Sequence, residues 1–132
     1  MEKQSTRAEW DVVYAERACL LAQADAFGLT TEKTAYSNAF NALGTYLNAG
    51  VTYTPSATPP NWLTDANLSA TTTIAGTTFR ANWSALYTAR QTLLNTVSAT
   101  AKTLASAAQT AANNAQTTAG NAQTAATNAQ TT

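Results

Sequence analysis

The C-terminal part of the chain is an uncharged sequence repeat, and no other feature restricts the fold as strongly. From Thr103 to Thr132 there is no charged and no aromatic residue, and alanines recur with a period of seven, split into alternating spacings of three and four. This spacing is typical of the buried a and d positions of a coiled coil. The repeat therefore predicts a helix that associates with copies of itself. We expect its seam to consist of Leu94, Ala101, Leu104, Ala105, Ala108, Ala112, Ala115, Ala119, Ala122, Ala126 and Ala129.

A seam of alanines favours association only weakly. Each alanine contributes roughly a third of what a leucine would at about 25 cal/mol per Å² of buried apolar surface. The repeat therefore needs Leu93–Leu104, or flanking protein, to nucleate association. Small seam residues also leave the number of associating helices open. Composition alone would allow a low-complexity disordered linker instead, and the regular heptad phase favours the coiled coil.

Residues 1–50 are predicted to form a helical hairpin. The segment 5–27 carries apolar residues at the spacing of one buried helical face, and Gly28 follows it, where a left-handed C-cap favours glycine. A second helix is expected to start after Thr30-Thr31 and to end near Asn48-Ala49-Gly50. The short connection between the two helices favours an antiparallel arrangement.

Residues 51–77 are predicted to be a Pro/Thr-rich connecting segment. Three prolines between 55 and 60 exclude a helix there. The spaced apolar anchors of the segment are Trp62, Leu63, Leu68 and Ile74, and we expect Trp62 and Leu68 to pin it across the helices. Ala75-Gly76 is expected to form a turn. An apolar helical stripe resumes at 78 and continues into the repeat. The sequence therefore predicts an all-α fold in which one long helix covers 78–132.

The side chains that catalysis and metal binding require are scarce. The chain has no histidine and one cysteine, Cys19, and it contains no nucleophile or phosphate-binding motif. Its carboxylates are interspersed with arginines, as on a solvated helix face. We therefore expect no catalytic residue, no cofactor and no metal site, and we expect that the protein is not an enzyme.

Charge and hydropathy argue against two classes of partner. The chain has seven basic and seven acidic residues and no basic stripe, so binding to nucleic acid is not expected. No apolar run approaches the ~18 residues of a membrane span. Tyr53 and Trp62, in the connecting segment, are the aromatic residues that we expect to be available for a surface contact.

Five segments of the sequence, in this order and spacing, resemble a helical module of large bacteriophage tail proteins. They are Leu21–Gly28, Thr31–Tyr36, Ala42–Leu47, Thr73–Arg80 and Tyr87–Asn95. The proteins concerned are tail-tip attachment or central tail fibre proteins, often called host-specificity proteins, and the resemblance covers roughly residues 2–100. It implies a homotrimer whose modules follow one another along the tail axis. It also implies a place in the virion, other tail proteins as partners, and synthesis in the cytoplasm of the bacterial host.

One departure from that family lies at the N-terminus. The family pattern leads us to expect an Asp/Gly-containing Leu-Thr-Pro segment before the Glu-Lys pair, whereas this chain starts at Met1 and continues with Glu2 and Lys3. We therefore expect the chain to be a piece of a longer protein. The resemblance carries no catalytic residue over to this sequence.

Three functions are compatible with these observations. The first is a spacer and trimerisation element of a phage tail tip or central fibre. The second is a module that binds a host cell-surface glycan or receptor through Tyr53, Trp62 and the connecting segment. The third is a segment of a bacterial trimeric stalk or adhesin, which the heptads alone would allow.

Overall fold

The computed structural model describes residues 3–68 and 76–131, and they form an all-α fold, as predicted. The elements are α1 (Lys3–Ala26), α2 (Thr30–Leu47), a single 3-10 turn η1 (Asn61–Leu63), α3 (Asp65–Leu68) and α4 (Thr77–Thr131). No strand occurs among the described residues. Contacts divide the chain into two units, Met1–Val97 and Ser98–Thr132, and each is described by itself.

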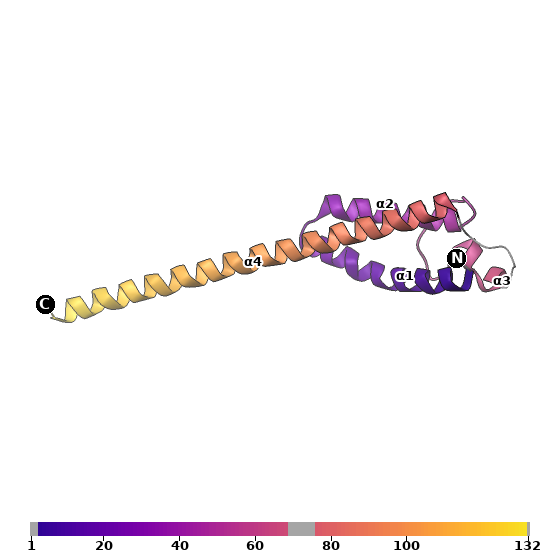
Figure 1. Ribbon diagram of the computed structural model, residues 1–132. Coiled ribbons are helices and arrows are strands. Elements are labelled where there is room, and N and C mark those ends of the chain that lie inside the picture. The colour runs from indigo at the N-terminus through magenta and orange to yellow at the C-terminus, as the bar shows by residue number, and fades with distance from the viewer. Residues whose placement is uncertain (1–2, 69–75, 132) are drawn as a thin grey trace. The chain divides into compact units, whose positions relative to one another are not determined.

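Helices α1 and α2 form an antiparallel pair, and the N-terminal part of α4 lies beside them (Figure 1). The reversal between α1 and α2 depends on Gly28, whose φ of 67° is costly for a residue with a side chain. The Leu29 amide donates to the Ala24 carbonyl at 2.8 Å, and the Gly28 amide donates to Asp25 at 3.2 Å. These two bonds make a Schellman motif, which ends the helix where the glycine predicted it.

The core of the first unit is built around aromatic rings. The Trp10 ring on α1 lies 4.9 Å from the Phe40 ring on α2 and 5.5 Å from the Tyr53 ring. From α4, Trp83, Leu86 and Leu93 complete the same buried cluster. The predicted helical stripes supply these residues except Tyr53, so the helices bury the faces that their periodicity indicated.

The connecting segment folds back onto the hairpin and contains more helix than the sequence predicted. Leu63, in the turn η1, is fully buried, whereas Trp62 and Leu68 are half-buried. Leu63 therefore anchors the segment more deeply than the two residues expected to do so. The anchor proposed at Ile74 and part of the turn before α4 lie outside the described residues.

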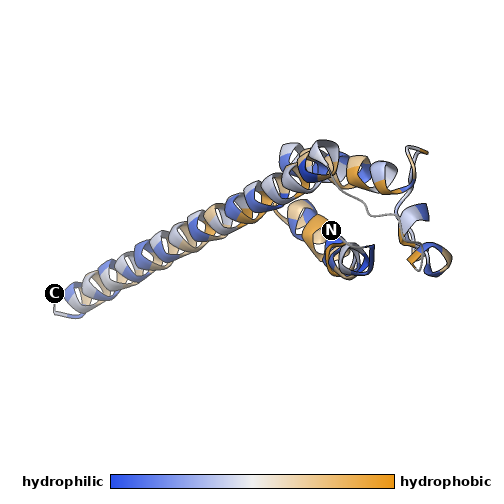
Figure 2. Ribbon diagram, turned by 45° about the vertical axis from the view of Figure 1, so that its right-hand side comes forward, coloured by the Kyte–Doolittle hydropathy of each residue, from blue (hydrophilic) through white to orange (hydrophobic). Residues whose placement is uncertain are grey.

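Helix α4 continues without interruption for 55 residues. In the second unit, the residues from Ala101 to Thr131 are all exposed. Apolar and polar residues alternate along this part of the helix (Figure 2). Several threonine hydroxyls donate back to the carbonyl four residues earlier, as Thr124 does to Gly120 at 3.1 Å, which satisfies their polar groups locally.

Gly44 is a testable packing requirement in α2. A Cβ atom at this position would lie 2.5 Å from Cδ1 of Tyr53. We expect Gly44→Ala to lower the free energy of unfolding by about 1–3 kcal/mol, the usual cost of overpacking. In a Tyr53→Ala background the same change should be neutral, or stabilising by up to about 1 kcal/mol, because alanine is the better helix former.

Urea denaturation of the wild type, Gly44→Ala, Tyr53→Ala and the double variant measures the coupling between the two positions. Gly120→Ala is the matched control, since a Cβ there would meet no atom within 4 Å. If Gly44→Ala lowered the free energy of unfolding equally with and without the tyrosine ring, the predicted clash with Tyr53 would be contradicted.

Candidate functional site

The predicted seam lies along α4, and most of it faces solvent in the single chain. Leu94 is half-buried against the core of the first unit, whereas Leu104 is 54% exposed and the seam alanines from Ala101 onward are exposed. On a continuous helix, spacings of three and four keep the alanines on one slowly drifting face. The association through this face stays a prediction, and the exposed alanines are available for it.

Polar side chains beside the seam bond along their own helix. The Gln109 amide donates to Oδ1 of Asn113 at 3.0 Å, and Gln91 donates in the same way to Asn95 at 2.8 Å. Both pairs span four residues, so they stabilise the helix by a few tenths of a kcal/mol each. Gln109 and Asn113 lie beside the alanine column, whereas Gln91 is two heptads before Ala105 and so shares its position.

An ion pair joins α1 to α4 within the first unit. The Arg90 guanidinium donates from Nε and Nη2 to the two carboxylate oxygens of Glu16. This hydrogen bonding raises the pKa of Arg90, and burial opposes the increase. Because a two-bond arginine–carboxylate pair fixes both distance and orientation, it sets how α4 sits against α1.

A buried tyrosine lies near this ion pair. Tyr36 has no exposed surface, and its hydroxyl has no hydrogen-bond partner among the described residues. Burial, and then the negative charge of Glu16, raise the pKa of Tyr36 to about 12. The unpaired hydroxyl costs stability, because a buried polar group loses its bonds to water.

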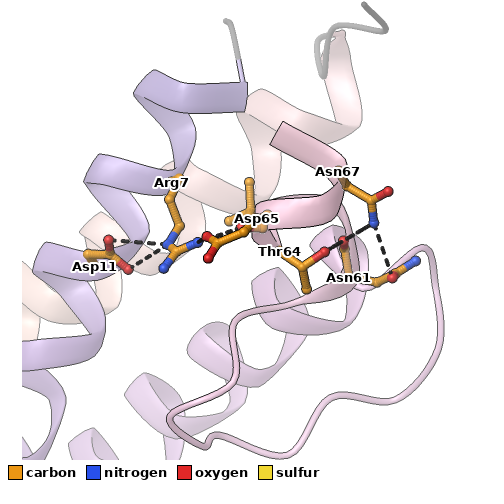
Figure 3. A network of polar contacts seen from close by, with 7 residues as sticks. Arg7, Asp11, Asn61, Thr64, Asp65 and Asn67 are labelled. Atoms are coloured by element: carbon orange, nitrogen blue, oxygen red, sulfur yellow. Dashed lines mark hydrogen bonds and ion pairs between the residues drawn. The ribbon is translucent and has the colours of Figure 1, made fainter. Parts of the chain in front are cut away.

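Arg7 holds the connecting segment against α1 (Figure 3). Its Nη1 donates to the Leu63 carbonyl at 2.8 Å and to Asp65 at 3.1 Å, while its Nε donates to Asp11 at 3.0 Å. The bond to Asp11 is the largest cause of the raised pKa of Arg7. On the same segment the Asn67 amide donates to the Asn61 carbonyl at 2.6 Å. These polar contacts, together with the buried Leu63, hold η1 and α3 in place.

The two aromatic residues proposed for surface contact differ in their surroundings. Tyr53 is only 8% exposed, its ring packs against Gly44, and its hydroxyl donates to the Thr58 carbonyl at 2.7 Å. The expectation of an exposed Tyr53 is thus corrected, because the ring completes the core. Trp62 is half-buried, and its ring meets Tyr46 edge-on with centroids 5.5 Å apart.

A groove that sequence reasoning missed lies between α2 and the start of the connecting segment. Its volume is about 510 Å³, and it is open to solvent. Its lining is uncharged and consists of Asn41, Ala42, Thr45, Thr52, Tyr53, Thr54 and Pro55. Oδ1 of Asn41 is buried and has no partner among the described residues. No sequence pattern indicated the groove, because it forms only where the segment folds back over α2.

The described residues contain neither a cluster of metal-binding side chains nor a membrane-spanning helix. No three side chains of the kinds that bind metal ions lie together there. None of the helices in the described ranges is both long and apolar enough to cross a membrane.

Comparison with known proteins gives a partial relationship. The chain is similar to a phage tail fiber protein. It is 30% identical over 101 residues to the "Tail fiber protein" of Enterococcus phage phiEF24C, a match that covers 76% of this chain and 5% of that protein. No family model matches the sequence, and no solved structure matches it. The similarity supports a loose relationship to phage tail fibre proteins.

The raised pKa of Tyr36 predicts that the folded protein loses stability at alkaline pH. The hydroxyl ionises near pH 10 in the unfolded chain and near 12 in the folded one, so the unfolded state binds fewer protons between these values. Stability therefore falls as pH rises from 10 to 12, by about 2–3 kcal/mol in total for a shift of this size. Tyr36→Phe removes this contribution, and it should leave stability at pH 7 unchanged or higher.

Urea denaturation of the wild type and Tyr36→Phe at pH 7 and near pH 11 measures how much more stability the wild type loses between the two pH values. The remaining lysines and tyrosines titrate in both proteins, so they cancel in the comparison. Parallel pH dependences would show that the Tyr36 hydroxyl ionises as readily in the folded chain as in the unfolded one.

Proposed function

We propose that this chain is a non-enzymatic structural module of a phage tail fibre or tail tip, acting as a spacer and trimerisation element. The similarity to a phage tail fiber protein supports a structural role in the tail. The observation that carries the finer proposal is the part of α4 from Ala101 to Thr131, which is exposed on every side and yet follows a strict heptad pattern.

A helix of this composition requires association to be stable. Isolated helices depend on packing of an apolar face, because nucleation is costly and propagation adds little per residue. Threonine and asparagine, frequent in the repeat, lower helix propensity relative to alanine. Burial of the alanine face between copies removes that face from water and lets the backbones approach closely. Three copies in parallel form a narrow, rod-like spacer.

The polar side chains of the first unit support a structural role over catalysis. Arg90 holds Glu16, Arg7 holds Asp11 and Asp65, and Lys33 contacts Asp25 at 2.7 Å. Each of these carboxylates is held by a basic side chain of the same unit, whereas a general acid or base must be able to reach a proton of the substrate. The charges of this chain thus serve to tie helices and segments together.

The location and partners follow from the same proposal. The module is part of the virion, it assembles with other tail proteins, and it is synthesised in the cytoplasm of the bacterial host. The match to a small fraction of a much longer protein is consistent with one module among several along a fibre.

A second candidate function is binding of a neutral sugar, and the groove beside α2 favours it. Its lining combines hydroxyl and amide groups with the apolar surface of Ala42 and Pro55, and it carries no charge. Such a surface suits a neutral, hydroxyl-rich ligand of a host surface. Two-dimensional NMR with N-acetylglucosamine and galactose tests it. Binding shifts the amides of Asn41 and Thr52 in the wild type, and Asn41→Ala removes the response while Asn38→Ala, outside the groove, keeps it.

The trimerisation proposal predicts different effects from two matched pairs of substitutions. Ala115→Asp with Ala122→Asp places carboxylates on the seam, where each would be desolvated beside its symmetry mates. We expect association to weaken at least tenfold, which corresponds to about 1.4 kcal/mol. Gln116→Asp with Gln123→Asp adds the same charge beside the seam and should have a much smaller effect.

Sedimentation equilibrium of the wild type and both variants measures this difference. A wild type that remains monomeric at high concentration would refute self-association. Equal weakening by the two pairs would show that charge alone matters and that the seam is misplaced.

A further inference from the structure

Large apolar side chains are exposed at few places in the described residues, and two of them lie on the first unit where α1 borders α4. Val12 on α1 is 64% exposed and Tyr87 on α4 is 40% exposed. Val12 lies one turn from Glu9 and from Glu16 on the same side of α1. Glu16 pairs with Arg90, and Glu9 is near enough to Tyr87 to help raise the pKa of its hydroxyl, after burial. Both apolar residues therefore flank the α1–α4 contact.

Tyr87 also has a defined position in the heptad register. With Ala108 taken as position d, counting back by sevens gives Ala101, Leu94 and then Tyr87. Leu94 and Tyr87 therefore share position d with every second alanine of the seam, whereas Ala105 and Ala112 lie at position a. The intramolecular core uses a neighbouring face of α4, with Trp83, Leu86 and Leu93 buried. Tyr87 stacks on Trp83 with centroids 5.8 Å apart, and its outer side remains in solvent. We call Val12, Tyr87 and Leu94 the d-strip.

The area that a stable assembly needs indicates what covers the d-strip. A specific interface buries about 1,000 Å² or more, and an alanine seam supplies only small side chains. Burial of a fully exposed large apolar side chain contributes about 1.5–3 kcal/mol. The exposed parts of Val12 and Tyr87 would therefore add to the alanine seam, and the half-buried Leu94 would add less. In a parallel, in-register coiled coil each d residue meets the same residue of the other copies. Chains that pair through the alanines consequently bring Tyr87 and Leu94 of each copy together.

We propose that the d-strip is an interface with a second copy of this chain, so that the unit Met1–Val97 takes part in assembly together with the repeat. The proposal rests on the proposed self-association. In it, Tyr87 and Leu94 form seam layers between copies, and Val12 on α1 contacts α4 of the neighbouring copy. The helical hairpin then stabilises the trimer directly, and the weak alanine seam does not have to hold it alone.

Cysteine cross-linking of the full chain tests the proposal. In a Cys19→Ser background, Tyr87→Cys places thiols of neighbouring copies within reach of a disulfide, for which Cα atoms must lie about 4.4–6.8 Å apart. Mild oxidation should give a dimer-sized species on non-reducing gels. Val51→Cys is the matched control, because Val51 is 65% exposed and outside the d-strip, and it should give little cross-linking.

A second pair of variants measures the energetic contribution. Tyr87→Lys should weaken association at least tenfold in sedimentation equilibrium, whereas Val51→Lys should change it less than twofold. Circular dichroism checks that both variants keep their helix content, and if Tyr87→Lys loses helix the cross-linking result decides.

The outcomes separate this inference from the proposed function. A trimeric wild type in which Tyr87→Cys and Val51→Cys cross-link equally, and Tyr87→Lys has no effect, overturns the d-strip interface while trimerisation stands. A monomeric wild type overturns both proposals.

Discussion

The packing of Trp10 is the interaction on which the rest of the first unit depends. Its ring contacts Phe40 from α2 and Tyr53 from the connecting segment, so one side chain of α1 joins three parts of the chain. The close approach of Tyr53 is available only because Gly44 has no side chain on the facing surface of α2. With that contact in place the connecting segment returns over the hairpin, and the groove beside α2 exists as a consequence.

Around this core, the polar contacts decide orientation more than stability. Arg7 reaches a backbone carbonyl and two carboxylates, and Arg90 engages both oxygens of Glu16. Partly exposed ion pairs contribute little net free energy. Their fixed geometry nevertheless selects one arrangement of α1, α4 and the short helices. Tyr36, buried beside them without a hydrogen-bond partner in the described part of the chain, is a local cost of that arrangement.

Helix α4 presents two kinds of face, and this division connects the fold to the proposed role. One face is buried by the chain's own hairpin. The other carries Tyr87, Leu94 and the alanines at every seventh position from Ala101 in a single heptad register; Tyr87 and the alanines are exposed, and Leu94 is half-buried. In a module with this division of faces, the long helix can extend the fibre while the helical hairpin of each copy packs around it. The partial similarity to a phage tail fiber protein agrees with such a use.

The sequence by itself determined the three long helices and their order, and the heptad pattern of α4 is a feature of the sequence. Apolar periodicity, the Gly28 cap and the prolines act over a few residues, so they can be recognised in the sequence without knowing the tertiary contacts. Only the tertiary structure decided that Tyr53 is buried, that Leu63 is the deeper anchor in place of Trp62, and that Asn41 lines a groove. Exposure of a side chain in an irregular segment depends on which distant surface the segment meets, here the gap that Gly44 leaves on α2. That is a property of packing between elements, and no local pattern in the sequence records it.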